Sequence, residues 1–290
     1  MNAEERSDNH ENRNESNTLP FSERKIADLP GHWLLARLGK RVLRPGGKKL
    51  TEQMLDAASL QDSDVVELAP GLGKTAKSIL ALHPSSYVGV ESDPDAAELT
   101  RSAIGHQGDV VSGDASCTGL PDSSADVVIG EAMLTMQTDR HKIEIAAEAL
   151  RVLRPGGRYA IHELAIEPND LDDSIKNEIR KDLARSIKVN ARPLTPTEWT
   201  NLLRAAGFEI EHVGFAPMAL LEPRRIFADE GLLRTLKFVA NVAREGDARR
   251  RILSMRTTFT KYRDHLSAIE VIAVKPDSID ALGSGDIERS

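Results

Sequence analysis

The chain has 290 residues, of which 40% are hydrophobic and 4% aromatic, and its formal net charge is −7. This length and apolar content suit one large α/β domain with additions, or two small domains. The acidic balance argues against a general nucleic-acid binder, and the single cysteine, Cys117, excludes an internal disulfide framework and a multi-cysteine zinc site.

The sequence shows neither the pattern of a membrane-spanning helix nor that of an export signal. No apolar run approaches the roughly 20 residues that span a bilayer. Residues 1–17 are polar throughout and lack the apolar core of a signal peptide. We therefore expect a soluble, cytoplasmic protein without stable membrane insertion.

The N-terminal part of the chain divides into two segments. Residues 1–22 are rich in Asn, Glu, Ser and Asp and have no apolar period, which predicts a disordered tail. Residues 23–62 read as an N-terminal helical segment, broken at Pro45-Gly46-Gly47.

Short β-rich runs then alternate with helical patterns. Strands are predicted at residues 64–69, 87–91, 110–112, 125–130 and 158–166, and helices at 74–82, 95–104 and 141–153. This alternation predicts a parallel sheet with helices on both faces.

The remaining chain changes character after Glu167. Helices are predicted at 171–189 and from Thr197 to a glycine cap at Gly207, and strands at 208–215 and 267–274. Between those two strands lies a helical insertion at about 222–264, and residues 277–290 read as a flexible tail. The predicted fold is thus an α/β, seven-stranded, mostly parallel sheet with a helical lid inserted before the last strand.

A glycine-bearing loop follows the first strand. Gly71 and Gly73 permit a tight turn with a ligand against the backbone, at the N-terminus of the next helix. A phosphate-binding P-loop is a weak alternative, because its first glycine would fall on Leu68. A nicotinamide-type fingerprint also fits the glycine spacing poorly.

Two carboxylates follow the next two strands. Glu91 stands about 20 residues past the glycine turn, where a carboxylate accepts both hydroxyls of a ribose. Capping of the next helix is the alternative role for Glu91, but Asp93 before Pro94 suits it better. Asp114 is placed to accept from an adenine amine, although a Gly-Asp pair alone is more often a turn.

Several motifs together resemble the class I S-adenosylmethionine-dependent methyltransferases. They are ELAPGLG (67–73), VGVESD (88–93), GDA (113–115), ADVVIGEAML (125–134) and LRPGG (153–157). They are most similar to the small-molecule group that includes the ubiquinone/menaquinone-biosynthesis and sterol methyltransferases. The resemblance implies a Rossmann-like methyltransferase domain over about residues 63–276, with S-adenosylmethionine as cofactor.

The resemblance also implies roles for individual residues. Glu67, Ala69 and Gly71 would line the methionine moiety, with Gly73 in the same cofactor loop; Glu91 would hold the ribose, Asp114 and Ala115 the adenine, and Glu131 would face cofactor and substrate. Family members usually carry glycine at the position of Ala69. Alanine is small, so we expect cofactor binding to survive with a stiffer loop.

Methyl transfer needs a base only when the acceptor must lose a proton. His162 and Glu163 are the candidates, and because adjacent strand residues face opposite ways, only one of them points into the cleft. A structural role at the sheet rim is the alternative for both. No metal site is predicted.

The insertion carries a charge opposite to that of the whole chain. Residues 223–263 hold eleven basic and four acidic side chains, a formal +7. They either form a solvated face that docks on the acidic body or attract an anionic acceptor through Arg249, Arg250 and Arg251. Apolar residues of the insertion pack on the core or wall a lipophilic pocket.

The predicted partner is therefore a small-molecule substrate, either anionic or lipophilic, and no nucleic acid; the oligomeric state stays open. A cofactor-binding protein without catalysis is the alternative function, with a P-loop nucleotide-binding protein behind it.

Overall fold

A computed structural model describes residues 19–21, 23–41 and 43–277. The predicted tails lie almost wholly outside these residues. Seven strands form one sheet in the order β3-β2-β1-β4-β5-β7-β6. Their bounds are β1 Asp64–Leu68, β2 Ser86–Glu91, β3 Asp109–Ser112, β4 Ala125–Glu131, β5 Leu153–Ile166, β6 Glu209–Pro217 and β7 Leu266–Val274.

The sheet is parallel except at one strand. β1 to β5 pair in parallel, whereas β7 runs antiparallel to both β5 and β6. This confirms the predicted seven-stranded, mostly parallel sheet. One predicted boundary is wrong: the strand expected at 158–166 already begins at Leu153, opposite Ala125, and a register shift follows.

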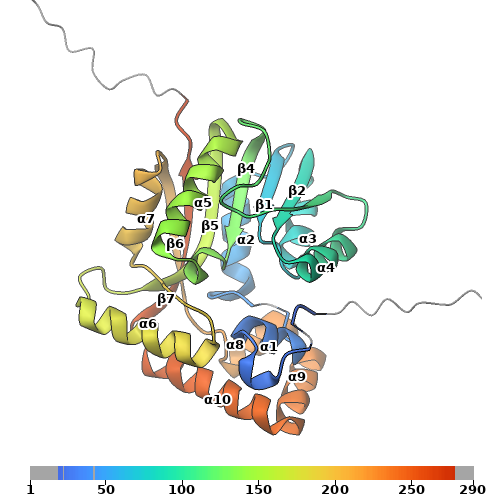
Figure 1. Cartoon of the computed structure of the whole chain (residues 1–290), viewed down its shortest axis with the longest axis vertical. Coiled ribbons are helices and arrows are strands. Elements are labelled where there is room, and N and C mark those ends of the chain that lie inside the picture. The colour runs from blue at the N-terminus through green and yellow to red at the C-terminus, as the bar shows by residue number, and fades with distance from the viewer. Residues whose placement is uncertain (1–18, 22, 42, 278–290) are drawn as a thin grey trace, which may run out of the picture.

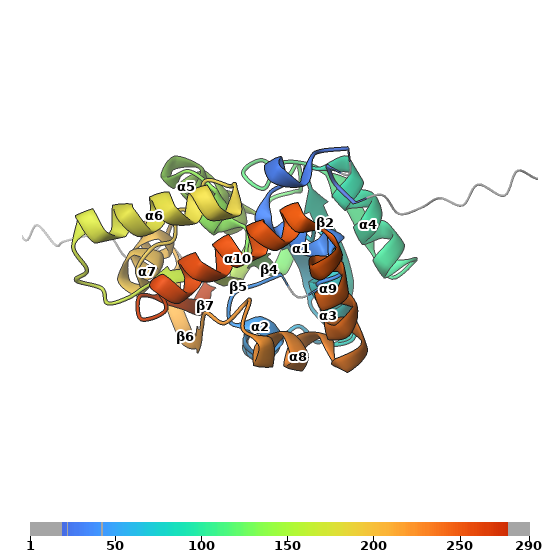
Figure 2. The same ribbon diagram turned by 90° about the horizontal axis from the view of Figure 1, so that it is seen from below.

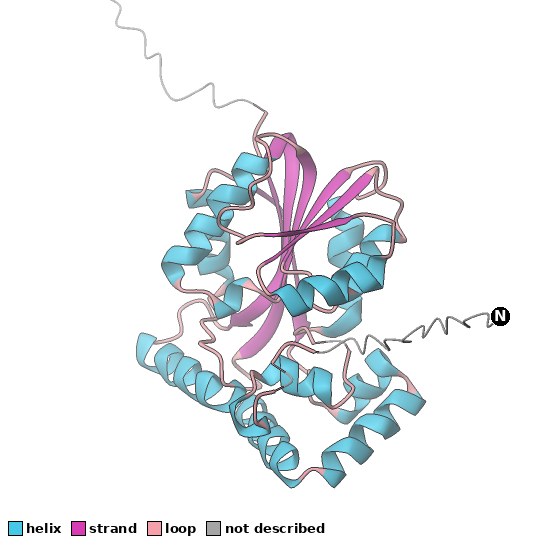
Figure 3. Cartoon of the chain, turned by 45° about the vertical axis from the view of Figure 1, so that its right-hand side comes forward, coloured by secondary structure: helices cyan, strands magenta, loops and turns pink. Residues whose placement is uncertain are grey.

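Helices cover both faces of the sheet (Figures 1 and 3). On one face lie α2 Gly47–Ala58, α3 Lys74–Leu80 and α4 Pro94–Ile104, whose apolar residues share a core with β1, β2 and β4. On the other face lie α5 Asp139–Val152 and α7 Pro196–Ala205, which share a larger core with the sheet. Continuous burial on both faces explains the near-continuous Val, Ile and Ala runs of these strands.

Local signals in the sequence explain where these helices begin. The Asp93 side chain accepts from the N–H groups of Asp95 and Ala96 at 3.0 Å, and Pro94 opens α4. Thr195 and Glu198 form a reciprocal capping box at the start of α7. Asp93 therefore caps α4, which leaves Glu91 for another role.

A further layer of helices lies beyond the carboxyl ends of the strands, and we call it the cap (Figures 1 and 2). It consists of α1 Gly31–Arg37, α6 Asp173–Ile187, α8 Pro223–Glu230, α9 Leu232–Arg244 and α10 Gly246–Lys261. Two short 3-10 helices, Ile26–Asp28 and Leu134–Met136, complete the described elements. The insertion before β7 therefore contains three helices, α8 to α10.

The cap has apolar cores of its own. One cluster joins Leu34, Leu35 and Leu38 of the α1 region to Phe238 of α9 and Met255 of α10. A second joins α6 to the end of β5. The N-terminal segment is thus part of the cap's core, although some 200 residues separate it from α9 in sequence. None of the described helices is long and apolar enough to cross a membrane.

Candidate functional site

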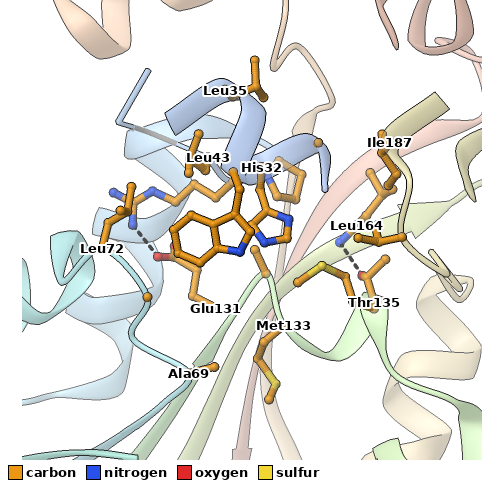
Figure 4. Close-up of a pocket in the computed structure, with 18 of the residues that line it drawn as sticks. His32, Leu35, Leu43, Ala69, Leu72, Glu131, Met133, Thr135, Leu164 and Ile187 are labelled. Atoms are coloured by element: carbon orange, nitrogen blue, oxygen red, sulfur yellow. Dashed lines mark hydrogen bonds and ion pairs between the residues drawn. The ribbon is translucent and has the colours of Figure 1, made fainter. Parts of the chain in front are cut away.

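A pocket of about 480 Å³ lies where the carboxyl ends of β1, β2, β4 and β5 meet the cap. Open α/β sheets bind ligands at this edge. The predicted site residues that line it are Glu67, Ala69, Gly71, Glu91, Glu131 and Glu163, whereas Gly73, Asp114, Ala115 and His162 do not. Figure 4 shows His32 of the N-terminal segment on the opposite side of the pocket from Ala69 and Met133.

The loop after β1 has a left-handed backbone at three positions, with φ of +53° at Ala69, +58° at Gly71 and +62° at Gly73. Glycine adopts this conformation freely, whereas alanine is strained there by roughly 1–2 kcal/mol. The family's usual glycine at the position of Ala69 thus has a conformational reason. Ala69 still adopts the turn, and its N–H donates to the Val90 carbonyl at 2.8 Å.

The two glycines of this loop serve different purposes. A Cβ on Gly71 would meet nothing closer than 3.9 Å, so its backbone is open to the pocket. A Cβ on Gly73 would stand 2.7 Å from the Cβ of Ala103 in α4. Gly73 therefore allows close packing of two helices and does not line the pocket.

Glu91 ends β2 as a buried carboxylate at the pocket wall. Its Oε2 accepts from the Gly71 N–H at 3.1 Å and its Oε1 from the Asp93 N–H at 3.1 Å. Burial raises the pKa of Glu91 above its usual range, although these hydrogen bonds act to lower it. The carboxylate joins the cofactor loop to the end of β2 and lines the pocket.

Glu67 is the most thoroughly buried acid of the loop region. Its Oε2 accepts from the Tyr87 hydroxyl at 2.6 Å. Burial raises the pKa of Glu67 to about 8, although the bond from Tyr87 acts in the opposite direction. A neutral carboxyl that borders a pocket is ready to ionise when a cationic group binds beside it. The open backbone at Gly71 and the acids Glu67 and Glu91 fit a ligand with a ribose and an ammonium group.

Asp114 and Ala115 follow β3, outside the lining of the pocket. The Asp114 side chain is 54% exposed and lies 3.4 Å from Nε2 of His141. Its Oδ1 accepts from the N–H and the hydroxyl of Ser116, and these bonds lower its pKa. The adenine role of these residues stays a prediction.

Glu131, at the end of β4, lies at the centre of a buried polar cluster. It contacts the Arg44 guanidinium and the hydroxyls of Thr51 and Thr75, and its Oε1 lies 2.9 Å from Nδ1 of His162. Burial acts to raise the pKa of Glu131, but Arg44 and His162 outweigh it and hold the pKa well below the usual range. This ionised carboxylate is held by the N-terminal segment and is a poor proton acceptor.

His162 is fully buried within the same cluster. Its Nε2 lies 2.5 Å from the Pro45 carbonyl oxygen, and its Nδ1 faces Glu131. Both ring nitrogens are therefore occupied, and His162 does not line the pocket. This arrangement gives no support to a direct role as base and suits a residue that positions the N-terminal segment on β5.

Glu163 points the other way and does line the pocket, as alternation along a strand requires. Its oxygens accept from the N–H groups of Met133, Leu134 and Thr135 at 2.7 to 3.0 Å, and from the Thr135 hydroxyl at 2.6 Å. Burial raises the pKa of Glu163, although these four hydrogen bonds act to lower it. Glu163 holds the loop after β4, which again indicates positioning and not proton transfer.

The N-terminal segment contributes pocket residues that the strand-end motifs did not indicate. His32 and Trp33 of α1 both line the pocket, and their rings lie 5.1 Å apart. Burial lowers the pKa of His32 to about 4, so its imidazole is neutral at pH 7. A lone histidine beside a tryptophan at a helix start carries no sequence signal, because its place depends on how α1 docks.

No group of three or more His, Cys, Asp or Glu that could hold a metal occurs in the part of the chain that the structure describes.

Known proteins share this sequence pattern. Residues 66–161 match the methyltransferase domain family. An uncharacterized protein of Haemophilus influenzae is 34% identical over 254 residues, 86% of this chain and 99% of that protein. The phthiotriol/phenolphthiotriol dimycocerosates methyltransferase of Mycobacterium leprae is 29% identical, over 52% of this chain and 61% of its own length.

Solved structures share the fold at low sequence identity. The cyclase SpnF superposes with a TM-score of 0.65 at 17% identity, over 84% of this chain and 93% of that one. Phosphoethanolamine N-methyltransferase 2 of Haemonchus contortus, in complex with S-adenosyl-L-methionine, superposes with a TM-score of 0.63 at 16% sequence identity, over 85% of this chain and 57% of that one. With the motif order, the sheet topology and the matched domain in agreement, the chain belongs to the class I S-adenosylmethionine-dependent methyltransferases, and S-adenosylmethionine is its cofactor.

Proposed function

We propose that this enzyme methylates a small, largely apolar molecule held between the sheet edge and the cap. One observation carries the proposal: the cap side of the pocket is almost entirely apolar. That wall includes Trp33, Leu35, Leu183, Ile187, Met218, Met255 and Phe259. A pocket with polar groups at one end and an apolar wall at the other suits a lipophilic acceptor beside a polar cofactor.

The polar end of the pocket supports the cofactor roles. The cofactor supplies a methyl group that its sulfonium already makes electrophilic, so the protein mainly has to position the acceptor. We assign Glu91 to the ribose hydroxyls and Glu67, Ala69 and Gly71 to the methionine end, since all four line the pocket at the ends of β1 and β2. Asp114 and Ala115 are proposed for the adenine on the strength of motif order.

His32 is the side chain that we propose for contact with the acceptor. It lines the pocket, and its imidazole is neutral at pH 7 because burial lowers its pKa to about 4. A neutral imidazole accepts a hydrogen bond from an acceptor hydroxyl or amine. A ring with so low a pKa is a weak base, so we assign His32 to orienting the acceptor and not to removing its proton.

The anionic-acceptor alternative finds little support in the cap's arginines. Arg249, Arg250 and Arg251 do not line the pocket. Arg251 donates to the carbonyl oxygens of Ile26 and Leu29 at 2.7 and 2.8 Å, and Arg250 pairs with Asp247. These side chains serve the cap itself.

Calorimetric titration with S-adenosylmethionine and its demethylated product tests the cofactor site. Glu91→Ala should weaken both ligands by roughly 10-fold or more, because a charge-assisted hydrogen bond is worth about 1.5–3 kcal/mol. Glu209→Ala, which removes an exposed acid of β6, is the matched control. Equal affinity of wild type and Glu91→Ala would mean that Glu91 does not bind the cofactor.

The acceptor is tested separately, with a panel that compares prenylated phenols and sterols with small polar amines. Met218 lines the pocket and is only partly buried, so Met218→Trp fills the apolar side of the pocket from its wall. It should abolish methyl transfer to apolar acceptors while cofactor affinity stays unchanged. Ile143→Trp, on the exposed surface of α5, is the control. Turnover confined to polar amines would contradict the lipophilic acceptor.

A further inference from the structure

An apolar stripe runs along the solvent side of α9. Leu232, Leu236 and Val239 follow helical spacing, and Leu233 lies beside them; their exposed fractions are 58%, 58%, 55% and 82%. The opposite side of the same helix buries Phe238 in the cap's core. Figure 2 shows α9 at the outer edge of the cap. One face of α9 thus holds the helix in place while the other presents large apolar side chains to solvent.

A basic pocket of about 450 Å³ lies beside this stripe. The cationic residues that line it are Lys40, Arg41, Lys74, Lys77, Arg234 and Lys237, and no carboxylate is among its lining residues. Arg234 and Lys237 belong to α9 and Lys74 and Lys77 to α3, so the cavity depends on the tertiary contact between cap and sheet layer.

Among the described residues, only Lys40 of these cations has a carboxylate within ion-pair distance. Lys40 is buried, 3.7 Å from Glu230, and its Nζ makes no hydrogen bond. The other five side chains form neither an ion pair nor a hydrogen bond with any described residue. Burial and then the neighbouring cations Arg41 and Lys77 lower the pKa of Lys74.

Some other cations of the cap have partners. Lys261 binds Glu178 and Asp182 at 2.8 and 2.9 Å, and Arg250 pairs with Asp247. The neighbouring cations of the basic pocket repel one another, and an external anion bound between them would relieve that repulsion. Phosphate groups have the charge and the oxygen acceptors for this.

We propose that the α9 stripe and the basic pocket form a docking surface for a bilayer that contains anionic phospholipids. The leucines would enter the boundary between headgroups and acyl chains, and headgroup phosphates would occupy the basic pocket. This is attachment to one leaflet, without insertion of a spanning helix. The proposal goes beyond the proposed function and does not depend on the identity of the acceptor.

Charge favours a bilayer over a second copy of this chain as the occupant. A two-fold dimer through the stripe would pack the same patch against itself. The basic pocket flanks that patch, so two such cavities would come together and repel each other. An anionic membrane covers the leucines and neutralises the cations at once.

Flotation of the full chain with lipid vesicles tests this surface. Vesicles of phosphatidylcholine alone are compared with vesicles that contain about one third phosphatidylglycerol, at low and high salt. Leu233→Ser with Leu236→Ser removes the stripe and keeps the charge. Lys77→Gln, Arg234→Gln and Lys237→Gln remove charge and keep the stripe. Two matched controls change residues on α5, α6 and α7. The control for the leucine variant is Ile143→Ser with Ile175→Ser, and the control for the charge variant is Arg140→Gln with Lys181→Gln and Arg204→Gln.

We expect wild type to float with the anionic vesicles at low salt and not with the neutral ones. Each test variant should lose at least roughly 10-fold in affinity, whereas the controls float as wild type. Cofactor titration must give wild-type affinity for every variant, which separates lost docking from lost folding or a lost cofactor site.

Three outcomes would overturn the proposal. The first is failure of the wild type to float with either kind of vesicle. The second is flotation of either test variant to the same extent as its matched control. The third is a dimer in light scattering that the leucine substitutions dissociate, which would assign the stripe to a second copy. Inorganic phosphate that binds in calorimetry, with no flotation of wild type, would make the basic pocket a small-anion site only.

Discussion

Four acids stand at or near the carboxyl ends of neighbouring strands, and each has a different environment. Glu67 bonds one tyrosine, Glu91 bonds two backbone amides, and Glu163 holds a loop through four bonds. Glu131 alone contacts an arginine, and its pKa alone is lowered. Burial raises the pKa of the other three. Residue type and position in a motif do not distinguish these acids; the groups packed around them do.

Proton release on cofactor binding follows from the state of Glu67. With a pKa of about 8, its carboxyl is mostly protonated at pH 7, and an ammonium group bound beside it favours the ionised form. Binding at pH 7 should therefore release about one proton, and affinity should rise as pH rises from 6 to about 7.5, above which the ligand's own ammonium group begins to lose its proton. Calorimetry in two buffers of different ionisation enthalpy measures this. Glu67→Gln should abolish the proton release, and an unchanged release would contradict the assignment.

The buried pair of Arg44 and Glu131 makes a stability prediction. Both side chains are under 10% exposed, so Arg44→Ala leaves an ionised carboxylate buried without its main partner. The free energy of unfolding should fall by about 3–5 kcal/mol. Urea denaturation measures it, with Arg140→Ala, which breaks the exposed pair with Glu144, as a control that should change little. A similar small effect of both substitutions would mean that water reaches Glu131.

At the scale of elements, the β1–α3 loop combines two requirements. Its backbone must turn with positive φ at three residues, and α3 must approach α4 closely. Ala69 shows that a small side chain is tolerated where the turn alone is at stake. At Gly73 the approach of α4 leaves no room for one. A loop of this kind tolerates substitution according to what packs behind it.

Gly73→Ala separates the two requirements. The new methyl group would meet Ala103 at 2.7 Å in addition to the cost of φ at +62°, so we expect a loss of roughly 2–4 kcal/mol in unfolding free energy. Gly119→Ala is the control, since φ there is +73° and nothing lies within 4 Å. It should cost only roughly 1–2 kcal/mol. Equal losses in chemical denaturation would show that α4 moves aside freely.

At the scale of the whole molecule, the pocket is assembled from two layers. The sheet supplies its polar end, and α1, α6 and α10 supply its apolar wall. The N-terminal segment joins these layers, because its arginine Arg44 contacts Glu131 while its carbonyl groups bind Arg251 of α10. Access to the pocket therefore depends on how firmly this segment is held.

Arg251→Gln tests that connection. Removing the guanidinium takes its hydrogen bonds from the Ile26, Ala27 and Leu29 carbonyls. Trypsin should then cleave at Arg24 and Lys25 at least several-fold faster, and unfolding free energy should fall by about 1–2 kcal/mol. Arg250→Gln, whose partner is on its own helix, is the control. Unchanged cleavage would mean that the apolar contacts of α1 suffice.

The sequence by itself determined the sheet, its helices and the end of each strand where the site lies. Those features depend on local periodicity, on caps such as Asp93 and on glycine spacing, all of which act between near neighbours in the chain. The cofactor class came from the resemblance of the ordered motifs to a known family. The tertiary structure alone decided which strand-end side chains face the pocket and which support it. His162 is buried against Pro45, His32 enters the pocket from the cap, and α3 and α9 together gather cations around one cavity. Each of these depends on contacts between segments far apart in sequence, and burial and charge at such contacts are set only when the layers pack together.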